Sequence, residues 1–331
     1  MKKYELHLGI DVSKATLDIC VMDNNAIVLD QLQIKNSIKE IKKFVKNILS
    51  KELITLFCFE NTGVYSMLLA VTLNEMEQDY WEVPAIEIKR SKGISRGKTD
   101  KADAKDISLY SIRSKDKLKL SSVTAIHIQQ LRLLFSEREK VIKAIKLFES
   151  TTENEDFLPN SIFKEVKQIN KRTQQKLAKT LIEINSKMNM LIQEHKELKK
   201  QKELLKSIPG IGDVTALYMM LITQGFKAFD NWRQFACYSG IAPFEYSSGS
   251  SIKGRTKVNH MADKKMKSLL HMASLSAMKV DPEMKRYYER KKEEGKSSML
   301  VLNNIRCKLA GRAFAVINRG TPFVNMQKFA A

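Results

Sequence analysis

The residues Tyr-Glu-Leu-His-Leu-Gly-Ile-Asp-Val, at positions 4–12, alternate between apolar side chains and other side chains. One face of this segment carries Leu6, Leu8, Ile10 and Val12. The opposite face carries His7, Gly9 and Asp11. Because successive side chains of a strand point to opposite faces, the pattern predicts a β-strand with one apolar face and a carboxylate near its end.

The segments after this strand predict an α/β domain over residues 1–118. They are predicted strands at 17–22 and 26–34, a helix at 38–48, a strand at 54–59, a helix at 64–77 and a strand at 81–83. The polar pair Asn36-Ser37 caps the first predicted helix. The continuous apolar run at 54–59 is typical of a central strand buried on both faces. Three consecutive strands followed by alternating helices and strands indicate one mixed sheet covered by helices.

The rest of the chain is predicted to be mostly helical. Between residues 119 and 203 we expect a helical hairpin, whose second helix carries apolar residues at alternating steps of four and three. This seam comprises Leu177, Leu181, Ile184, Met188, Leu191, His195, Leu198, Lys202 and Leu205. The spacing favours a coiled coil used for dimerisation over an ordinary packed helix pair. Residues 204–331 are then expected to form a separate, mostly helical domain.

Charge and composition narrow the classes of function. The chain has 57 Lys and Arg against 37 Asp and Glu, a net charge of +20, and 18 basic against 6 acidic residues fall within 251–331. Such an excess attracts polyanions, because neutralised phosphates release condensed counterions. Nucleic acid is therefore favoured over a ribosomal surface, an anionic membrane or a merely solvated basic surface. The sequence has no long apolar run, so we expect no membrane span. Its four cysteines are scattered, so we expect no zinc site and a reducing cytoplasm.

Four carboxylates are candidates for a metal site. Asp11 and Glu60 end two predicted strands, while Asp100 and Asp103 lie three residues apart on one face of a predicted helix. Each acid alone could cap a turn or helix, or pair with a lysine. Converging carboxylates repel one another unless cations neutralise them, and hard oxygen ligands select Mg²⁺ or Mn²⁺. Their joint placement resembles the ribonuclease-H-like fold, in particular the Holliday-junction-resolvase (RuvC-like) branch with its Asp-Glu-Asp-Asp set.

A glycine-rich turn is the first candidate for nucleic-acid contact. Gly210 and Gly212, in Ile-Pro-Gly-Ile-Gly at 208–212, permit a tight turn between two helices. The second helix would then offer free backbone N–H groups to a phosphate, as in helix-hairpin-helix modules. The alternative is a plain turn that packs two helices.

A serine-rich segment is the second candidate. Residues 240–255 have the composition of a flexible basic loop, in which we expect Lys253, Arg255 and the following Lys257 to contact nucleic acid. A serine hydroxyl is a weak nucleophile that needs a base or a metal to activate it. No neighbouring residue identifies such a base.

Taken together, these segments resemble one family of insertion-sequence transposases, also described as bridge-RNA-guided recombinases. Its members combine an N-terminal Asp-Glu-Asp-Asp domain with a C-terminal serine domain. The matching motifs, in order, are GIDVSK at 9–14, FENTGVY at 59–65, KTDKADA at 98–104, IPGIG at 208–212, YSGIAPFEYSSGSSIKG at 238–254 and NRGTPF at 318–323. No single motif is decisive, but six of them in this order are highly specific.

The resemblance implies a chemistry and a set of partners. It implies that Ser248, next to Gly249, attacks a DNA phosphate to give a covalent phosphoserine, although Ser247 leaves a one-residue ambiguity. It also implies that the four acids hold magnesium near that serine, within one subunit or between subunits. Homodimers would pair into tetramers, and a structured noncoding RNA would select donor and target DNA, in the bacterial cytoplasm near the nucleoid. Two alternatives are a metal-dependent junction endonuclease that uses water as nucleophile, and a non-enzymatic scaffold.

Overall fold

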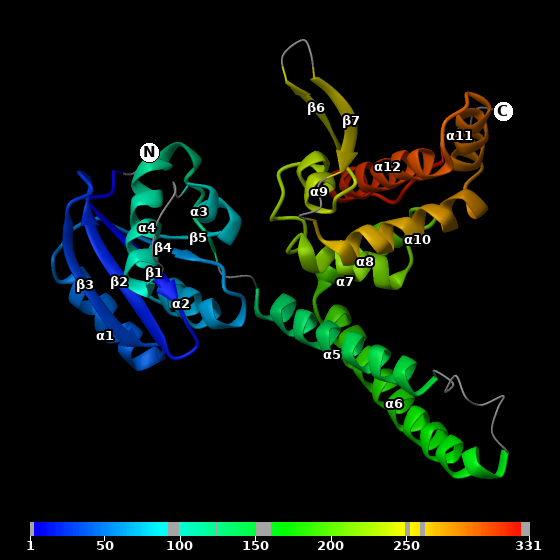
Figure 1. Ribbon diagram of the computed structural model, residues 1–331, viewed down its shortest axis with the longest axis horizontal. Coiled ribbons are helices and arrows are strands. Elements are labelled where there is room, and N and C mark those ends of the chain that lie inside the picture. Colours follow the sequence, from blue (N-terminus) through cyan, green and yellow to red (C-terminus); the bar gives the residue numbers. More distant parts are fainter. Residues whose placement is uncertain are drawn as a thin grey trace. The chain divides into compact units, whose positions relative to one another are not determined.

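The computed structural model describes residues 3–91, 99–122, 125–149, 160–248, 252–258 and 262–325; of the side chains of 160, 162, 245–248 and 252–257, nothing is described. The chain separates into two compact units, residues 1–123 and 124–331 (Figure 1). The predicted three-part division at 118 and 203 stays a prediction. No helix in the described part of the chain is long and apolar enough to cross a membrane.

The first unit contains a five-stranded mixed sheet in the order β3-β2-β1-β4-β5. Its strands are β1 (Leu6–Val12), β2 (Thr16–Asp23), β3 (Val28–Lys35), β4 (Thr55–Glu60) and β5 (Tyr80–Val83). The first three strands are antiparallel neighbours, whereas β4 runs parallel to β1 and β5 runs parallel to β4. This arrangement confirms the predicted mixed sheet and is consistent with a ribonuclease-H-like domain.

Helices cover the two faces of this sheet. The helices are α1 (Ile38–Leu49), α2 (Val64–Glu75), α3 (Ala85–Ser91), α4 (Asp100–Arg113) and a short 3-10 turn, η1 (Lys115–Lys117). The apolar face of β1 packs in one cluster with buried residues of α1 and α2. On the other face, α4 lies across β1, β2 and β4 (Figure 1). The alternation in residues 4–12 therefore predicted correctly which side chains of β1 enter the α1–α2 core.

The second unit begins with a helical hairpin. Helices α5 (Ile126–Glu149) and α6 (Asn160–Glu194) lie side by side (Figure 1), and Arg138 Nε donates to Asn185 Oδ1 at 3.0 Å. The predicted seam does not run along one helix, because the backbone of His195 is extended and a new helix, α7 (Lys196–Lys206), begins after it. The buried seam residues join α5 in a core of the same chain. Use of the seam for dimerisation stays a prediction.

The remaining elements are α8 (Asp213–Ile222), α9 (Trp232–Tyr238), β6 (Pro243–Ser248), β7 (Ile252–Val258), α10 (Lys264–Val280), α11 (Pro282–Glu293) and α12 (Ser298–Arg319). The helices among them share one apolar core with α7, and α8 and α12 contact it directly. Strands β6 and β7 form an antiparallel hairpin, so the interpretation of residues 240–255 as a flexible loop was wrong. The glycine and serine content suggested a loop, but the aromatic residues of β6 and the β-branched residues of β7 favour paired strands.

Candidate metal centre and serine hairpin

Two of the predicted acids end neighbouring strands of the first sheet. Asp11 is the penultimate residue of β1, and Glu60 is the last residue of β4. The strands β1 and β4 are parallel, and Ile10 is paired with Phe59. Each acid is the next residue of its strand, so the two acids lie at the same level of the same sheet edge. Both side chains are half-buried. The order of strands alone therefore brings these two carboxylates to one place.

The other two acids lie in the first turn of α4. Thr99 caps this helix, since its side chain accepts a hydrogen bond from the backbone N–H of Ala102 at 3.2 Å. Asp100 and Asp103 follow within the first turn. Carboxylates are favourable there, because the unsatisfied N–H groups give a helix N-terminus partial positive charge. The prediction that this pair begins a helix is confirmed.

Helix α4 approaches β1 so closely that it requires a glycine. A Cβ atom on Gly9 would lie 2.2 Å from the carbonyl oxygen of Ala104 and 2.2 Å from the amide nitrogen of Ser108. Ser108 Oγ donates to the carbonyl of His7 at 2.8 Å, and the buried His7 Nδ1 lies 2.9 Å from Ser111 Oγ. These contacts hold α4 directly on the strand that carries Asp11. Sequence reasoning missed them, although a glycine inside a strand is a known sign of close backbone approach.

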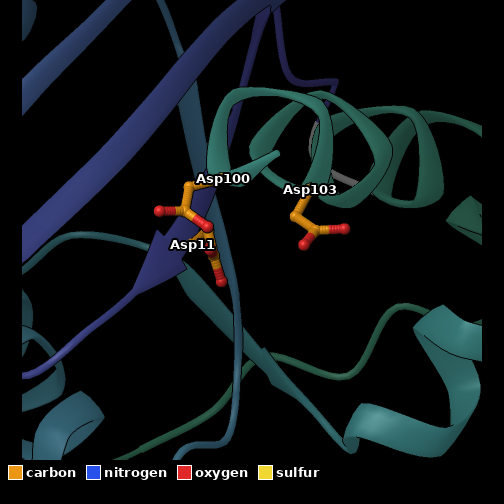
Figure 2. A group of neighbouring side chains, drawn as sticks. All are labelled: Asp11, Asp100 and Asp103. Carbon is orange, nitrogen blue, oxygen red and sulfur yellow. The ribbon is translucent and has the colours of Figure 1, made fainter. Parts of the chain in front are cut away.

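Three of the four predicted acids gather at this point. Asp11, Asp100 and Asp103 each offer one carboxylate oxygen, and these oxygens all lie within 4.8 Å of one another. Figure 2 shows the three side chains as neighbours, with Asp11 at the end of β1 and the two other aspartates on α4. Glu60 is outside this group of three, but its charge acts on Asp11. The structure thus brings three acids together and places the fourth at the adjacent strand end.

The electrostatics of Asp11 favour a bound cation. Burial, and then the negative charges of Asp103, Asp100, Glu60 and Asp18, raise the pKa of Asp11 to about 6. Asp18 was missed in the sequence; it lies opposite Asp11 in the β1–β2 register, and Gln33 donates to both of its oxygens at 3.0 Å. A divalent ion would offset this repulsion, and the all-oxygen donor set fits a hard cation such as Mg²⁺ or Mn²⁺.

The two glycines of the turn in the second unit have different surroundings. Gly210 has φ of +95°, and an added Cβ would lie 2.6 Å from the carbonyl oxygen of Ala273 in α10, so packing explains this glycine. Gly212 caps α8 with no side-chain hydrogen bond and has open space around it. The next residue, Asp213, pairs with Lys206 at 3.0 Å and Lys202 at 3.2 Å. Contact of the turn with nucleic acid stays a prediction.

The predicted serine is the last residue of β6. Ser248 is paired with Ile252 of β7, and Ser247 is paired with Lys253. The predicted basic contacts Lys253, Arg255 and Lys257 occupy alternate positions of β7. Gly249 lies outside the described residues. The hairpin therefore places the serine far along the strand from the points where β6 and β7 leave the helical core.

Both ends of this hairpin are fixed to helices. Asn303 Nδ2 of α12 donates to the carbonyl of Ile241, just before β6, at 2.7 Å. After β7, Asp263 caps α10 by accepting from the amide of Met266 at 2.7 Å, and it also accepts from the hydroxyl of Tyr218 at 2.9 Å. None of these anchoring residues could be found from a local sequence pattern.

Comparison with known proteins gives matches in both units. A family model described as "Transposase", of the DEDD type named after IS110, matches residues 8–150, and one described as "Transposase IS116/IS110/IS902 family" matches residues 202–289. A "Pilin gene-inverting protein" of Moraxella lacunata is 26% identical over 335 residues, covering 96% of this chain and 97% of that protein.

Two further relatives match only part of the chain. A 43.6 kDa protein of insertion element IS110 from Streptomyces coelicolor is 26% identical over 138 residues, covering 42% of this chain and 33% of that protein. A 42 kDa protein of insertion element IS900 from Mycobacterium paratuberculosis is 27% identical over 125 residues, covering 37% and 31%.

Proposed function

Since the chain belongs to the IS110 family of transposases, and is thus a DNA-recombination enzyme, we propose that it exchanges DNA strands through Ser248 with a divalent ion held by Asp11, Glu60, Asp100 and Asp103. The observation that carries the metal half of this proposal is the gathering of Asp11, Asp100 and Asp103 oxygens within 4.8 Å. The serine half rests on the resemblance of residues 238–254 to the serine domain of this family and on the basic residues Lys253, Arg255 and Lys257 in the paired strand β7.

Each residue has a defined part in the proposed reaction. Ser248 Oγ attacks the phosphorus of a DNA phosphodiester, forming an O–P bond while a deoxyribose oxygen leaves and takes up a proton. A second deoxyribose hydroxyl then attacks the phosphoserine, so that the serine is released and a new phosphodiester forms. The ion, when bound, stabilises charge on the phosphate oxygens. The carboxylates orient that ion, and Lys253 and Arg255 balance negative charge that builds up in the transition state.

The partners follow from charge and family. The net charge of +20 supports binding of phosphodiester backbones. We assign donor and target DNA as substrates, a structured noncoding RNA as guide, and a homodimer that pairs into a tetramer as the working assembly. A composite site, in which the serine meets the acids of the same or another subunit, belongs to this proposal. The name of the Moraxella relative, a gene-inverting protein, supports DNA rearrangement as the class of reaction.

The test is a search for a covalent protein–DNA adduct in cells that express the protein. DNA that remains attached after denaturation is expected with the unchanged chain and with Ser247→Ala, but not with Ser248→Ala. Asp11→Asn should reduce the adduct by roughly a thousandfold, since metal assistance stabilises the transition state by several kcal/mol. Asp116→Asn, at an exposed position of η1, is the matched control. An adduct that survives Ser248→Ala would refute the serine mechanism and favour attack by water.

RNA that purifies with the protein provides an independent readout. A short structured RNA recovered after nuclease trimming, and retained by Ser248→Ala and Asp11→Asn, is expected. Recovery of unselected RNA fragments in place of one defined species would contradict guidance by RNA while leaving the strand-exchange chemistry untouched.

A further inference from the structure

Two neighbouring apolar side chains are exposed at the start of α2. Val64 is 69% exposed and Tyr65 is 46% exposed, whereas Leu69 and Leu73 of the same helix are buried in the core of the first unit. The exposed pair therefore adds little to the packing of this unit. The first turn of α2 thus offers solvent an aromatic ring and, at the neighbouring position, a branched aliphatic side chain.

Backbone contacts place this pair at the sheet edge that carries the acid cluster. Helix α2 begins four residues after Glu60. Asn36 Nδ2 donates both to the carbonyl of Ser13, at 2.9 Å, and to the carbonyl of Tyr65, at 3.2 Å. Ser13 is two residues beyond Asp11. One amide thus joins the segment that follows Asp11 to the backbone of Tyr65.

The turn before the pair is fixed by several hydrogen bonds. Gly63 has φ of +71°, which favours glycine, and its N–H donates to Asn61 Oδ1 at 3.0 Å. The buried Ser66 donates to Glu82 Oε1 at 3.0 Å and accepts from the amide of Thr62 at 3.3 Å. Because the backbone is held in this way, little backbone freedom is lost when a ligand binds to the exposed side chains.

Exposure alone does not identify the site, since the same unit exposes apolar residues elsewhere. Ile27 is 57% exposed and lies directly before Val28 of β3. Val28 is paired with Met22, which is paired with His7 near the start of β1. Ile27 is therefore at the opposite end of the sheet from Asp11. It supplies a matched control for a test at Val64.

We propose that Tyr65, with Val64 beside it, stacks on an unpaired DNA base next to the phosphate that the acid cluster engages. The proposal rests on the proposed function of that cluster. A phosphodiester that enters a carboxylate-held metal site brings its attached bases along the same sheet edge, and an unstacked base needs an apolar surface. Aromatic side chains satisfy this need for any base, because every base has a π-face. Lys14, exposed next to Ser13, adds positive charge at the same edge.

Photocrosslinking tests this site directly. The probe is a short single-stranded DNA containing 5-iododeoxyuridine, bound to the full chain with Ca²⁺ and irradiated, and the crosslinked peptide is identified by mass spectrometry. We expect the crosslink at Tyr65. Tyr65→Ala should weaken binding of this DNA about 5- to 100-fold, Tyr65→Phe should restore it, and Val64→Ala should weaken it less. Ile27→Ala should bind as the unchanged chain does.

The outcomes separate this proposal from the one on which it rests. A crosslink that maps elsewhere, or unchanged binding by Tyr65→Ala, overturns the stacking site. A stronger crosslink to Tyr65 from the corresponding 5-iodouridine RNA than from DNA overturns the assignment to DNA. Asp11→Asn should lose the covalent adduct while it keeps the Tyr65 crosslink; if Asp11→Asn still forms the adduct, the proposed metal chemistry fails whatever Tyr65 does.

Discussion

The acid cluster and the serine hairpin are held by the fold in different ways. Asp11, Asp100 and Asp103 come together because a buried strand and a helix pack directly on each other around Gly9. Ser248, in contrast, is at the far end of β6, and the described contacts to helices lie at the root of its hairpin, at Ile241 and Asp263. Direct packing of α4 on β1 therefore fixes the geometry of the acids. The described contacts that position Ser248 lie instead at the other end of its hairpin.

The largest effect is expected from Gly9→Ala. The added Cβ would meet backbone atoms of α4 at 2.2 Å, so the helix must move and take Asp100 and Asp103 away from Asp11. We expect a loss of about 3 kcal/mol in the free energy of unfolding and loss of the covalent DNA adduct. Thermal unfolding and Mn²⁺ titration measure the two effects.

Gly212→Ala is the matched control from the second unit. It introduces the same methyl group into open space at an ordinary, negative φ. We expect less than about 1 kcal/mol of destabilisation and unchanged Mn²⁺ binding. Equal effects of the two substitutions would mean that the close contact of α4 and β1 does not organise the acid cluster.

Asn303→Ala tests how the β6–β7 hairpin is anchored to the helices. The carbonyl of Ile241 would lose its 2.7 Å hydrogen bond from Asn303 but keep the weaker one from Cys307 Sγ at 3.4 Å, so we expect a cost of about 1 kcal/mol. We expect less adduct through Ser248, but Mn²⁺ binding equal to that of the unchanged chain. Asn303→Asp, which cannot donate this bond, should resemble Asn303→Ala. A reduced affinity for Mn²⁺ would contradict independent anchoring of the two sites.

The sequence predicted the placement of the acids better than the local structure around Ser248, for a physical reason. The alternation in residues 4–12 and the apolar run at 54–59 define strands, and parallel strands bring Asp11 and Glu60 to one edge without knowledge of any other contact. The position of α4 depends on Gly9, Ser108 and His7, which no local pattern connects. The composition of residues 240–255 suggested a loop because a hairpin of two strands depends on pairing between segments, which local composition does not reveal.

The coiled-coil prediction failed in part for a related reason. The heptad spacing continues through His195, but the extended backbone there ends one helix and starts the next. The rings of His195 and His127 of α5 stack with centroids 4.0 Å apart. The spacing of apolar residues predicts a common face, but it contains no information about such a break in the backbone.

Acid is expected to remove a stabilising contribution of His7, and part of this loss is offset by Asp11, whose raised pKa of about 6 makes the folded state bind a proton more readily. Burial, and then the charge of Lys115, lower the pKa of His7 to about 4. At His7 the folded state therefore binds fewer protons than the unfolded state between pH 6.5 and 4, so the contribution of this group to stability is complete above about pH 6.5 and is lost as the pH falls through this window. From pH 7 to pH 5 this group accounts for about 2 kcal/mol.

Trp81 can report this change selectively. The chain has two tryptophans, and Trp232→Phe leaves Trp81 of β5 as the single reporter, within the first unit. Urea unfolding at pH 7 and pH 5 then measures the stability of this unit. His7→Gln in the same background should make the stability at pH 5, relative to pH 7, about 2 kcal/mol more favourable than it is with histidine. A pH dependence that is the same with histidine and glutamine would assign the effect to other groups.

The smallest effect is expected at the basic residues of β7. Lys253, Arg255 and Lys257 occupy alternate positions of one strand, and each is predicted to contact a phosphate without reading a base. Lys253→Ala should weaken DNA binding by about tenfold or less, and should reduce the slope of log affinity against log salt by about one. The loss should be similar for DNA of any sequence, because a phosphate contact carries no sequence information.

Lys42→Ala, which removes an exposed lysine of the first unit that pairs with Glu75 at 2.9 Å, is the control and should leave the slope unchanged. A slope that is unchanged by Lys253→Ala would remove the hairpin from the DNA interface, and would leave the acid cluster as the better supported of the two sites.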